Sequence, residues 1–125
     1  MRKAVTTDKA PKPVGPYSQA TIEGDFIFLA GQGPGNPETG ELDRGDVAHE
    51  TRRVFENIKA VLAAAGSSLD KVVKTTVFIT NAAWFNRVNE VYARYFPHNP
   101  PARSFVTIGS WPWEFDIEIE SIATV

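Results

Sequence analysis

The sequence of 125 residues contains no cysteine and only two histidines, His49 and His98. Without cysteine, the chain has no disulfide bond, no thiolate nucleophile and no cysteine-ligated zinc. Neither histidine belongs to an H-E-x-x-H pattern or to another spacing that is typical of metal ligands. We therefore expect no metal site in this protein.

The sequence also lacks long hydrophobic runs and an excess of positive charge. Its apolar stretches are far shorter than the ~20 residues that a transmembrane helix needs, and the N-terminal segment MRKAVTTDKAP has no apolar core of a signal peptide. Lys and Arg number 13 against 15 Asp and Glu, whereas proteins that neutralise nucleic-acid phosphates usually carry a basic excess. We expect a soluble, cytoplasmic protein without a membrane or nucleic-acid partner.

The remaining composition is that of an ordinary globular protein, with 42% hydrophobic and 22% charged residues. The length is near the common size of one domain and leaves no room for a separate regulatory domain. No internal repeat or long linker divides the chain. We expect a single domain over residues 1–125.

Two segments carry apolar residues at three- and four-residue spacing, which predicts two helices. The first spans residues 47–65, with Asp46 as its N-cap and Gly66 at its end. The second spans about residues 82–96, with Asn81 as its N-cap and a proline directly after it.

Strands are expected where β-branched and aromatic residues cluster, at residues 3–5, 20–22, 26–30, 72–80, 104–108 and 115–125. The order of elements is then β-β-β-α-β-α-β-β. This order predicts an α+β fold with a five- or six-stranded, mostly antiparallel sheet and two helices on one face. Because apolar residues such as Phe26 and Ile27 point to opposite faces, the face without helices is also partly apolar, and we expect other subunits to bury it.

Three places could carry chemistry. Arg103 begins a strand and could hold a carboxylate in a bidentate fork, although an isolated arginine is more often solvated. Glu118 and Glu120 share a strand face, where repulsion could raise a carboxylate pKa for acid–base work or merely protect a sheet edge. The turn at residues 14–19 brings Tyr17 into a strand, or is a plain loop. The glycines of segment 31–35 lack the G-x-G-x-x-G spacing of a dinucleotide-binding loop.

Seven motifs, in order along the whole chain, resemble the Rid (RidA/YjgF) family of reactive intermediate deaminases. They are Gly15-Pro16-Tyr17-Ser18-Gln19, Ala30-Gly31-Gln32, Asn36-Pro37-Glu38-Thr39-Gly40-Glu41, Val73-Lys74-Thr75-Thr76-Val77-Phe78, Val88-Asn89-Glu90-Val91-Tyr92, Pro101-Ala102-Arg103-Ser104 and Ile117-Glu118-Ile119-Glu120.

The resemblance implies a chorismate-mutase-like fold, a homotrimer with active sites between subunits, and hydrolysis of enamines and imines such as 2-aminoacrylate to 2-oxo acids and ammonia. It implies no cofactor. By the same resemblance, the carboxylate-binding arginine is Arg103 and the glutamate that positions or activates water is Glu118. The residues that line the pocket are Tyr17, Gly31, Asn89 and Phe105.

The sequence departs from the family pattern near this pocket. Phe105 stands where many RidA-type members have a small residue, and Trp111 and Trp113 lie in a segment that is usually Leu-Pro-rich. These tryptophans are expected to contact a larger apolar substrate or a neighbouring subunit. Two alternatives therefore stay open: a binding or regulatory trimer without turnover, and a deaminase for a bulkier enamine. RNA cleavage, an activity often attached to the family, is disfavoured by the acidic balance.

Overall fold

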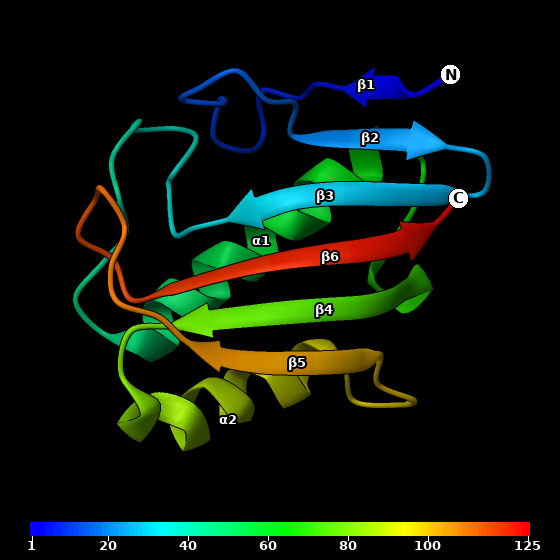
Figure 1. The fold of residues 1–125 in the computed structure, drawn as a ribbon. Coiled ribbons are helices and arrows are strands. Elements are labelled where there is room, and N and C mark those ends of the chain that lie inside the picture. The colour runs from blue at the N-terminus through cyan, green and yellow to red at the C-terminus, as the bar shows by residue number, and fades with distance from the viewer.

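The computed structural model describes residues 1–125. In chain order, its elements are β1 (Lys3–Val5), β2 (Ala20–Glu23), β3 (Phe26–Gln32), α1 (Val47–Ala64), β4 (Val72–Ile79), α2 (Phe85–Tyr95), β5 (Ala102–Thr107) and β6 (Ile117–Thr124) (Figure 1). Short 3₁₀ turns at Leu69–Lys71 and Ala82–Trp84 precede β4 and α2. The predicted element order is confirmed.

The six strands form one mixed sheet in the order β1-β2-β3-β6-β4-β5. Neighbouring strands are antiparallel except β4 and β5, which are parallel. A parallel pair needs a crossover, and α2 supplies it. Both helices lie on the same side of the sheet (Figure 1), so the predicted α+β architecture is confirmed.

The helix ends follow the capping residues. The side chain of Asp46 accepts a hydrogen bond from the Ala48 amide at 3.2 Å, and Gly66 adopts a φ of +79° just beyond α1. The second predicted helix differs at its start. The Asn81 side chain accepts from the Ala83 amide at 2.9 Å, but the chain first forms a 3₁₀ turn at Ala82–Trp84 and becomes α-helical only at Phe85.

The core lies between the helices and the sheet. Its fully buried side chains include Ile27 of β3, Val54, Phe55, Ile58, Val61 and Leu62 of α1, Val77 and Ile79 of β4, Val88 of α2, and Ile117 and Ile119 of β6. Each such side chain contributes about 1.5–3 kcal/mol by leaving water. The core therefore anchors the central strands β6 and β4.

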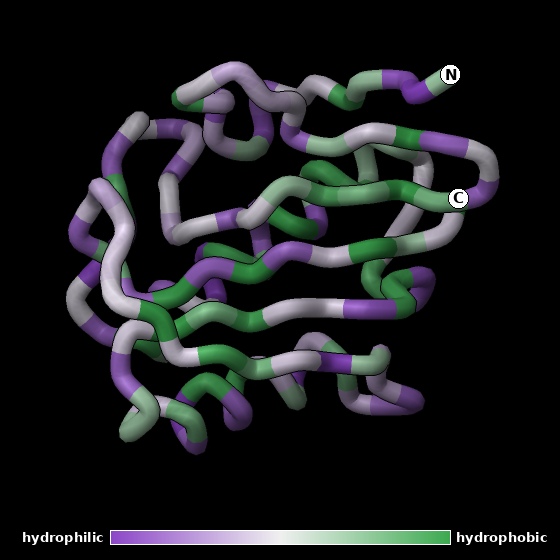
Figure 2. Tube along the Cα trace, in the orientation of Figure 1, coloured by the Kyte–Doolittle hydropathy of each residue, from purple (hydrophilic) through white to green (hydrophobic).

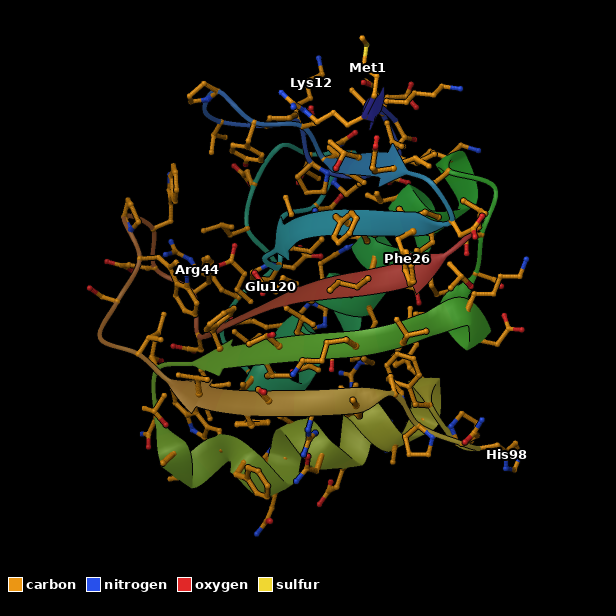
Figure 3. The ribbon with its side chains drawn as sticks, turned by 45° about the vertical axis from the view of Figure 1, so that its right-hand side comes forward. Met1, Lys12, Phe26, Arg44, His98 and Glu120 are labelled. Carbon is orange, nitrogen blue, oxygen red and sulfur yellow. The ribbon has the colours of Figure 1, made fainter.

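The other face of the sheet is open and partly apolar. Phe26, Phe28 and Val106 expose 45%, 44% and 39% of their surface there. Figure 3 shows Phe26 on this open face together with Glu120 of β6. The predicted apolar character of this face is confirmed, and its burial by other subunits stays a prediction. Neither helix is both long and apolar enough to cross a membrane.

Candidate active site

Glu118 lies near the start of β6, one of the two central strands. Ile117 and Ile119 face the helices and are fully buried, so Glu118 and Glu120 project from the open face, as the alternation predicts. Figure 2 shows this alternation of hydrophobic and hydrophilic residues along β6. Phe78 of β4 is the partner of Glu118 in the ladder. The core thus fixes which way the carboxylate points.

Two neighbours hold the Glu118 carboxylate. The indole Nε1 of Trp111 donates a hydrogen bond to Oε2 at 2.7 Å. On the other side, Gly31 of β3 comes so close that a Cβ at this position would lie 2.6 Å from Oε1. A larger residue at position 31 would therefore force the Glu118 carboxylate out of its position.

The pKa of Glu118 is raised above the ordinary glutamate value. Burial of the half-buried carboxyl group is the main cause; the Trp111 hydrogen bond acts in the opposite direction, and the charge of Glu120 raises the pKa further. A carboxylate with these neighbours can take up a proton more readily than an exposed one. This property suits general acid–base chemistry.

A cleft of about 780 Å³ opens beside Glu118. Tyr17, Gly31, Trp113 and Phe115 line it together with Glu118 and the segment 33–42. Tyr17 is half-exposed, and its hydroxyl accepts a long hydrogen bond from the Val14 amide at 3.3 Å. The structure therefore brings three of the expected site residues, Tyr17, Gly31 and Glu118, into one cleft.

The other three expected residues form a second cluster, on the helix-facing side of β5. The Arg103 Nη1 donates a hydrogen bond to the Asn89 side-chain oxygen at 2.7 Å. The guanidinium carbon lies 4.7 Å from the centre of the Tyr92 ring and 4.9 Å from that of Phe105, with Phe85 at 5.8 Å. Aromatic faces attract a guanidinium and restrict its position. Asn89 and Phe105 thus surround Arg103.

Arg103 and Glu118 do not meet within one chain. Arg103 shares its face of the sheet with Phe105, Asn89 and the helices, whereas Glu118 projects from the open face. A site that uses both residues needs a second copy of the chain. The expected active site between subunits stays a prediction.

Sequence reasoning missed two features of this region. The Trp111 indole donates a hydrogen bond to Glu118, a contact that residue spacing does not indicate, and Trp113 is exposed at the cleft; contact of either tryptophan with a substrate or a subunit stays a prediction. Glu50, in the first turn of α1, is fully buried and accepts a hydrogen bond from the Asp116 amide at 2.7 Å. Burial and the nearby Asp116 raise the pKa of Glu50 to about 7. Neither feature has a signal in residue spacing.

Comparison with known proteins identifies the family. The family model described as "Endoribonuclease L-PSP" matches residues 7–125. A RutC family protein of Pyrococcus horikoshii is 50% identical over 123 residues, which cover 98% of each chain. The 2-iminobutanoate/2-iminopropanoate deaminase of Homo sapiens is 41% identical over 123 residues, which cover 98% of this chain and 90% of the human protein.

Solved structures agree with the fold. A putative endoribonuclease from Thermotoga maritima superposes with a TM-score of 0.96 at 54% identity, covering 100% of this chain and 98% of the other. TdcF of E. coli, solved with bound serine, superposes with a TM-score of 0.93 at 40% identity and 98% coverage of both chains. The fold and site thus define a small α+β protein of the L-PSP class. Within that class, the chain belongs to the Rid (RidA/YjgF) family.

Proposed function

We propose that this protein hydrolyses reactive enamines and imines of the 2-aminoacrylate type to 2-oxo acids and ammonia. The observation that carries the proposal is the Glu118 carboxylate, half-buried in a cleft with one oxygen held by Trp111 and the other beside Gly31. Relatives named reactive intermediate deaminase and 2-iminobutanoate/2-iminopropanoate deaminase, at 42% and 41% identity, support the same chemistry.

In this proposal, Glu118 holds a water molecule over the imine carbon. The protonated C=N bond is already electrophilic, so the protein needs to supply no nucleophile of its own. Water oxygen adds to the carbon while a proton passes from water to the carboxylate. The nitrogen then takes that proton from Glu118; as the C–N bond breaks and ammonia leaves, the carbinol hydroxyl gives its proton back to the carboxylate and the C=O bond forms. The raised pKa of Glu118 supports proton uptake in this step.

Arg103 anchors the substrate carboxylate in the proposal. Its hydrogen bond to Asn89 and the rings of Tyr92 and Phe105 support a fixed position for the guanidinium. Only Nη1 is engaged by Asn89, so other N–H groups remain to form a bidentate pair with a carboxylate. Phe105 and Phe85 pack edge to face with their ring centres 4.7 Å apart, and they border the place where the substrate side chain would lie.

The site is completed by a second subunit. Arg103 and Glu118 point to opposite faces of the same sheet, and the open face carries exposed Phe26, Phe28 and Val106. Burying such an apolar face against another copy is favourable at about 25 cal/mol per Å². We propose a homotrimer in which Arg103 of one subunit and Glu118 of the next share one substrate.

The experiment follows imines made in situ by an amino-acid oxidase, with semicarbazide to trap the imine that survives. The panel runs from alanine-derived to leucine- and phenylalanine-derived imines. Glu118→Gln is expected to lower kcat by at least about 100-fold, the usual contribution of a general base. Arg103→Ala is expected to raise KM by about 10- to 100-fold, since a hydrogen bond to a charged group contributes about 1.5–3 kcal/mol.

Glu90→Gln and Arg94→Ala are the matched controls, because both side chains are exposed on α2 and have no part in the site. Native turnover by Arg103→Ala and Glu118→Gln would contradict the assigned roles. The imine that is hydrolysed fastest shows which substrate side chain fits beside Phe105 and Phe85.

Binding without turnover is the second candidate, favoured by the bound serine in the TdcF structure. Calorimetric titration with serine distinguishes the two. Serine binding without faster decay of any imine in the panel would favour a binding protein over a deaminase.

A further inference from the structure

Three contacts join the segment between β5 and β6 to the rest of the fold, and a fourth lies within the segment. Trp111 bonds to Glu118, and its ring packs against Phe115 with the ring centres 4.3 Å apart. Glu114 forms an ion pair with Arg44 at 3.0 Å, in the region where Figure 3 labels Arg44. The Asp116 amide donates to the buried Glu50. These contacts hold the indole against the carboxylate instead of leaving it free in solvent.

The bond restricts what Glu118 can do with its two oxygens. An indole N–H can only donate, so it pairs best with the ionised carboxylate. The Trp111 bond at 2.7 Å takes one acceptor position of Oε2, whereas Oε1 has no hydrogen-bond partner and is the freer oxygen to accept from a water molecule. Oε1 is also the atom that approaches Gly31 most closely, because the carboxyl group occupies the space that a Cβ would take at this position.

Three effects change the pKa of Glu118, and they do not all act in the same direction. Burial and the neighbouring Glu120 favour the protonated form, and the Trp111 bond favours the ionised form. The other charged side chains that line the cleft lie on its loops: Asp8, Lys12, Glu38 and Glu41. Across β6, the ladder partners Phe78 and Thr76 carry no charge. Trp111 is therefore the one side chain that donates directly to this carboxylate.

We propose that Trp111 is a positioning residue: it binds Oε2 of Glu118, leaves Oε1 to hold the water molecule and favours the ionised carboxylate. The catalytic part of this inference rests on the proposed function, and the placement of the indole on the carboxylate does not. Phenylalanine at position 111 would keep most of the ring and the burial while removing the donor. Trp111→Phe is therefore the informative change.

The first measurement follows the indole N–H signals of ¹⁵N-tryptophan-labelled protein by NMR across a pH titration. The chain has three tryptophans. We expect one indole signal to shift with a single midpoint, to disappear in Trp111→Phe and to lose its pH dependence in Glu118→Gln. The signal of Trp84, which packs against the core, reports that each variant is folded. A Trp111 signal that does not titrate would overturn the proposal.

The second measurement is the pH dependence of imine hydrolysis. Trp111→Phe is expected to lower kcat by about three- to tenfold at neutral pH. It should also shift the midpoint of the acid limb of kcat/KM to higher pH, because the lost bond favoured the ionised carboxylate. Trp113 lines the same cleft but makes no hydrogen bond to Glu118, so Trp113→Phe, whatever its effect on kcat, should keep the native midpoint of the acid limb.

The outcomes separate the two proposals. Hydrolysis by Trp111→Phe with the native acid limb would remove Trp111 from the mechanism and leave the deaminase proposal intact. A native protein that hydrolyses no imine, yet shows the titrating Trp111 signal, would contradict the deaminase function and support the placement of the indole on Glu118.

Discussion

At the scale of single residues, the site depends on contacts too close to tolerate extra atoms. Gly31 shows this most directly, because the space of its missing Cβ is filled by the Glu118 carboxyl group. Its φ is not in the left-handed region, so the backbone itself would accept alanine. The requirement for glycine is therefore imposed by the neighbouring side chain.

Gly31→Ala should thus separate activity from stability. The new methyl group would push the flexible Glu118 side chain off the Trp111 indole, and we expect at least a tenfold loss of kcat, about the worth of one charge-assisted hydrogen bond. The melting temperature should change by only a few degrees, because the side chain can rotate into the cleft. Calorimetry and the imine assay test this together, with Gly109→Ala as control, since no atom lies near its Cβ position. Native kcat in Gly31→Ala would show that the contact is not needed.

At the scale of elements, the N-terminus of α1 and the start of β6 are joined through one buried acid. Glu50 is fully buried, one of its oxygens accepts from the Asp116 amide, and the other has no partner. Burial, with the charge of Asp116 as a smaller cause, opposes its ionisation and raises its pKa from 4.5 to about 7. The folded protein therefore keeps a proton that the unfolded chain releases between these values.

Stability from the protonated Glu50 is full below about pH 4.5 and is lost as the pH rises through about 7. Glu50→Gln can still accept from Asp116 but never ionises. We expect the variant to exceed the native protein in stability by on the order of 1 kcal/mol above pH 7, with the difference vanishing in acid. Thermal unfolding at several pH values measures this. A constant difference across the pH range would rule out ionisation of Glu50 as the cause.

Elements proved more predictable from the sequence than the site. Hydrophobic periodicity and caps such as Asp46 are local signals, so the predicted ends of the strands and of α1 are nearly correct. The 3₁₀ turn that follows Asn81 and precedes α2 has no such signal. Motif resemblance indicated Arg103 and Glu118 separately. That the two side chains point to opposite faces of the sheet follows from the register of β5 and β6 against β4, which the sequence does not give. The roles of Trp111 and Glu50 depend on where the segment before β6 crosses the fold, which no local pattern encodes.

At the scale of the whole molecule, one chain carries two separate clusters, around Arg103 and around Glu118, which the proposed function treats as halves of one site. The proposed arrangement makes a specific prediction about mixtures of subunits. An Arg103→Ala trimer and a Glu118→Gln trimer each lack one group in every site. In a mixed trimer, an intact Arg103 can meet an intact Glu118 across one interface.

Denaturing the two inactive variants together and refolding them should therefore restore activity. For random assembly in equal amounts, about a quarter of the sites would contain both native groups. Light scattering should show one trimeric species. Each variant refolded alone serves as the control. Recovery no greater than that of the separate variants, or a monodisperse native monomer, would contradict the shared site.

The alternation along β6 also limits how such a protein can diverge. Inserting or deleting one residue there would turn Ile119 out of the core and bring Glu118 into it, destroying fold and chemistry at once. Substitutions in this strand must therefore keep apolar residues on the core face and the site residues on the open face. The connection before β6 is free of that restriction, and it is there that Trp111 reaches the carboxylate. We therefore expect new substrate preferences to arise from sequence changes in connecting segments such as this one, while the strands stay unchanged.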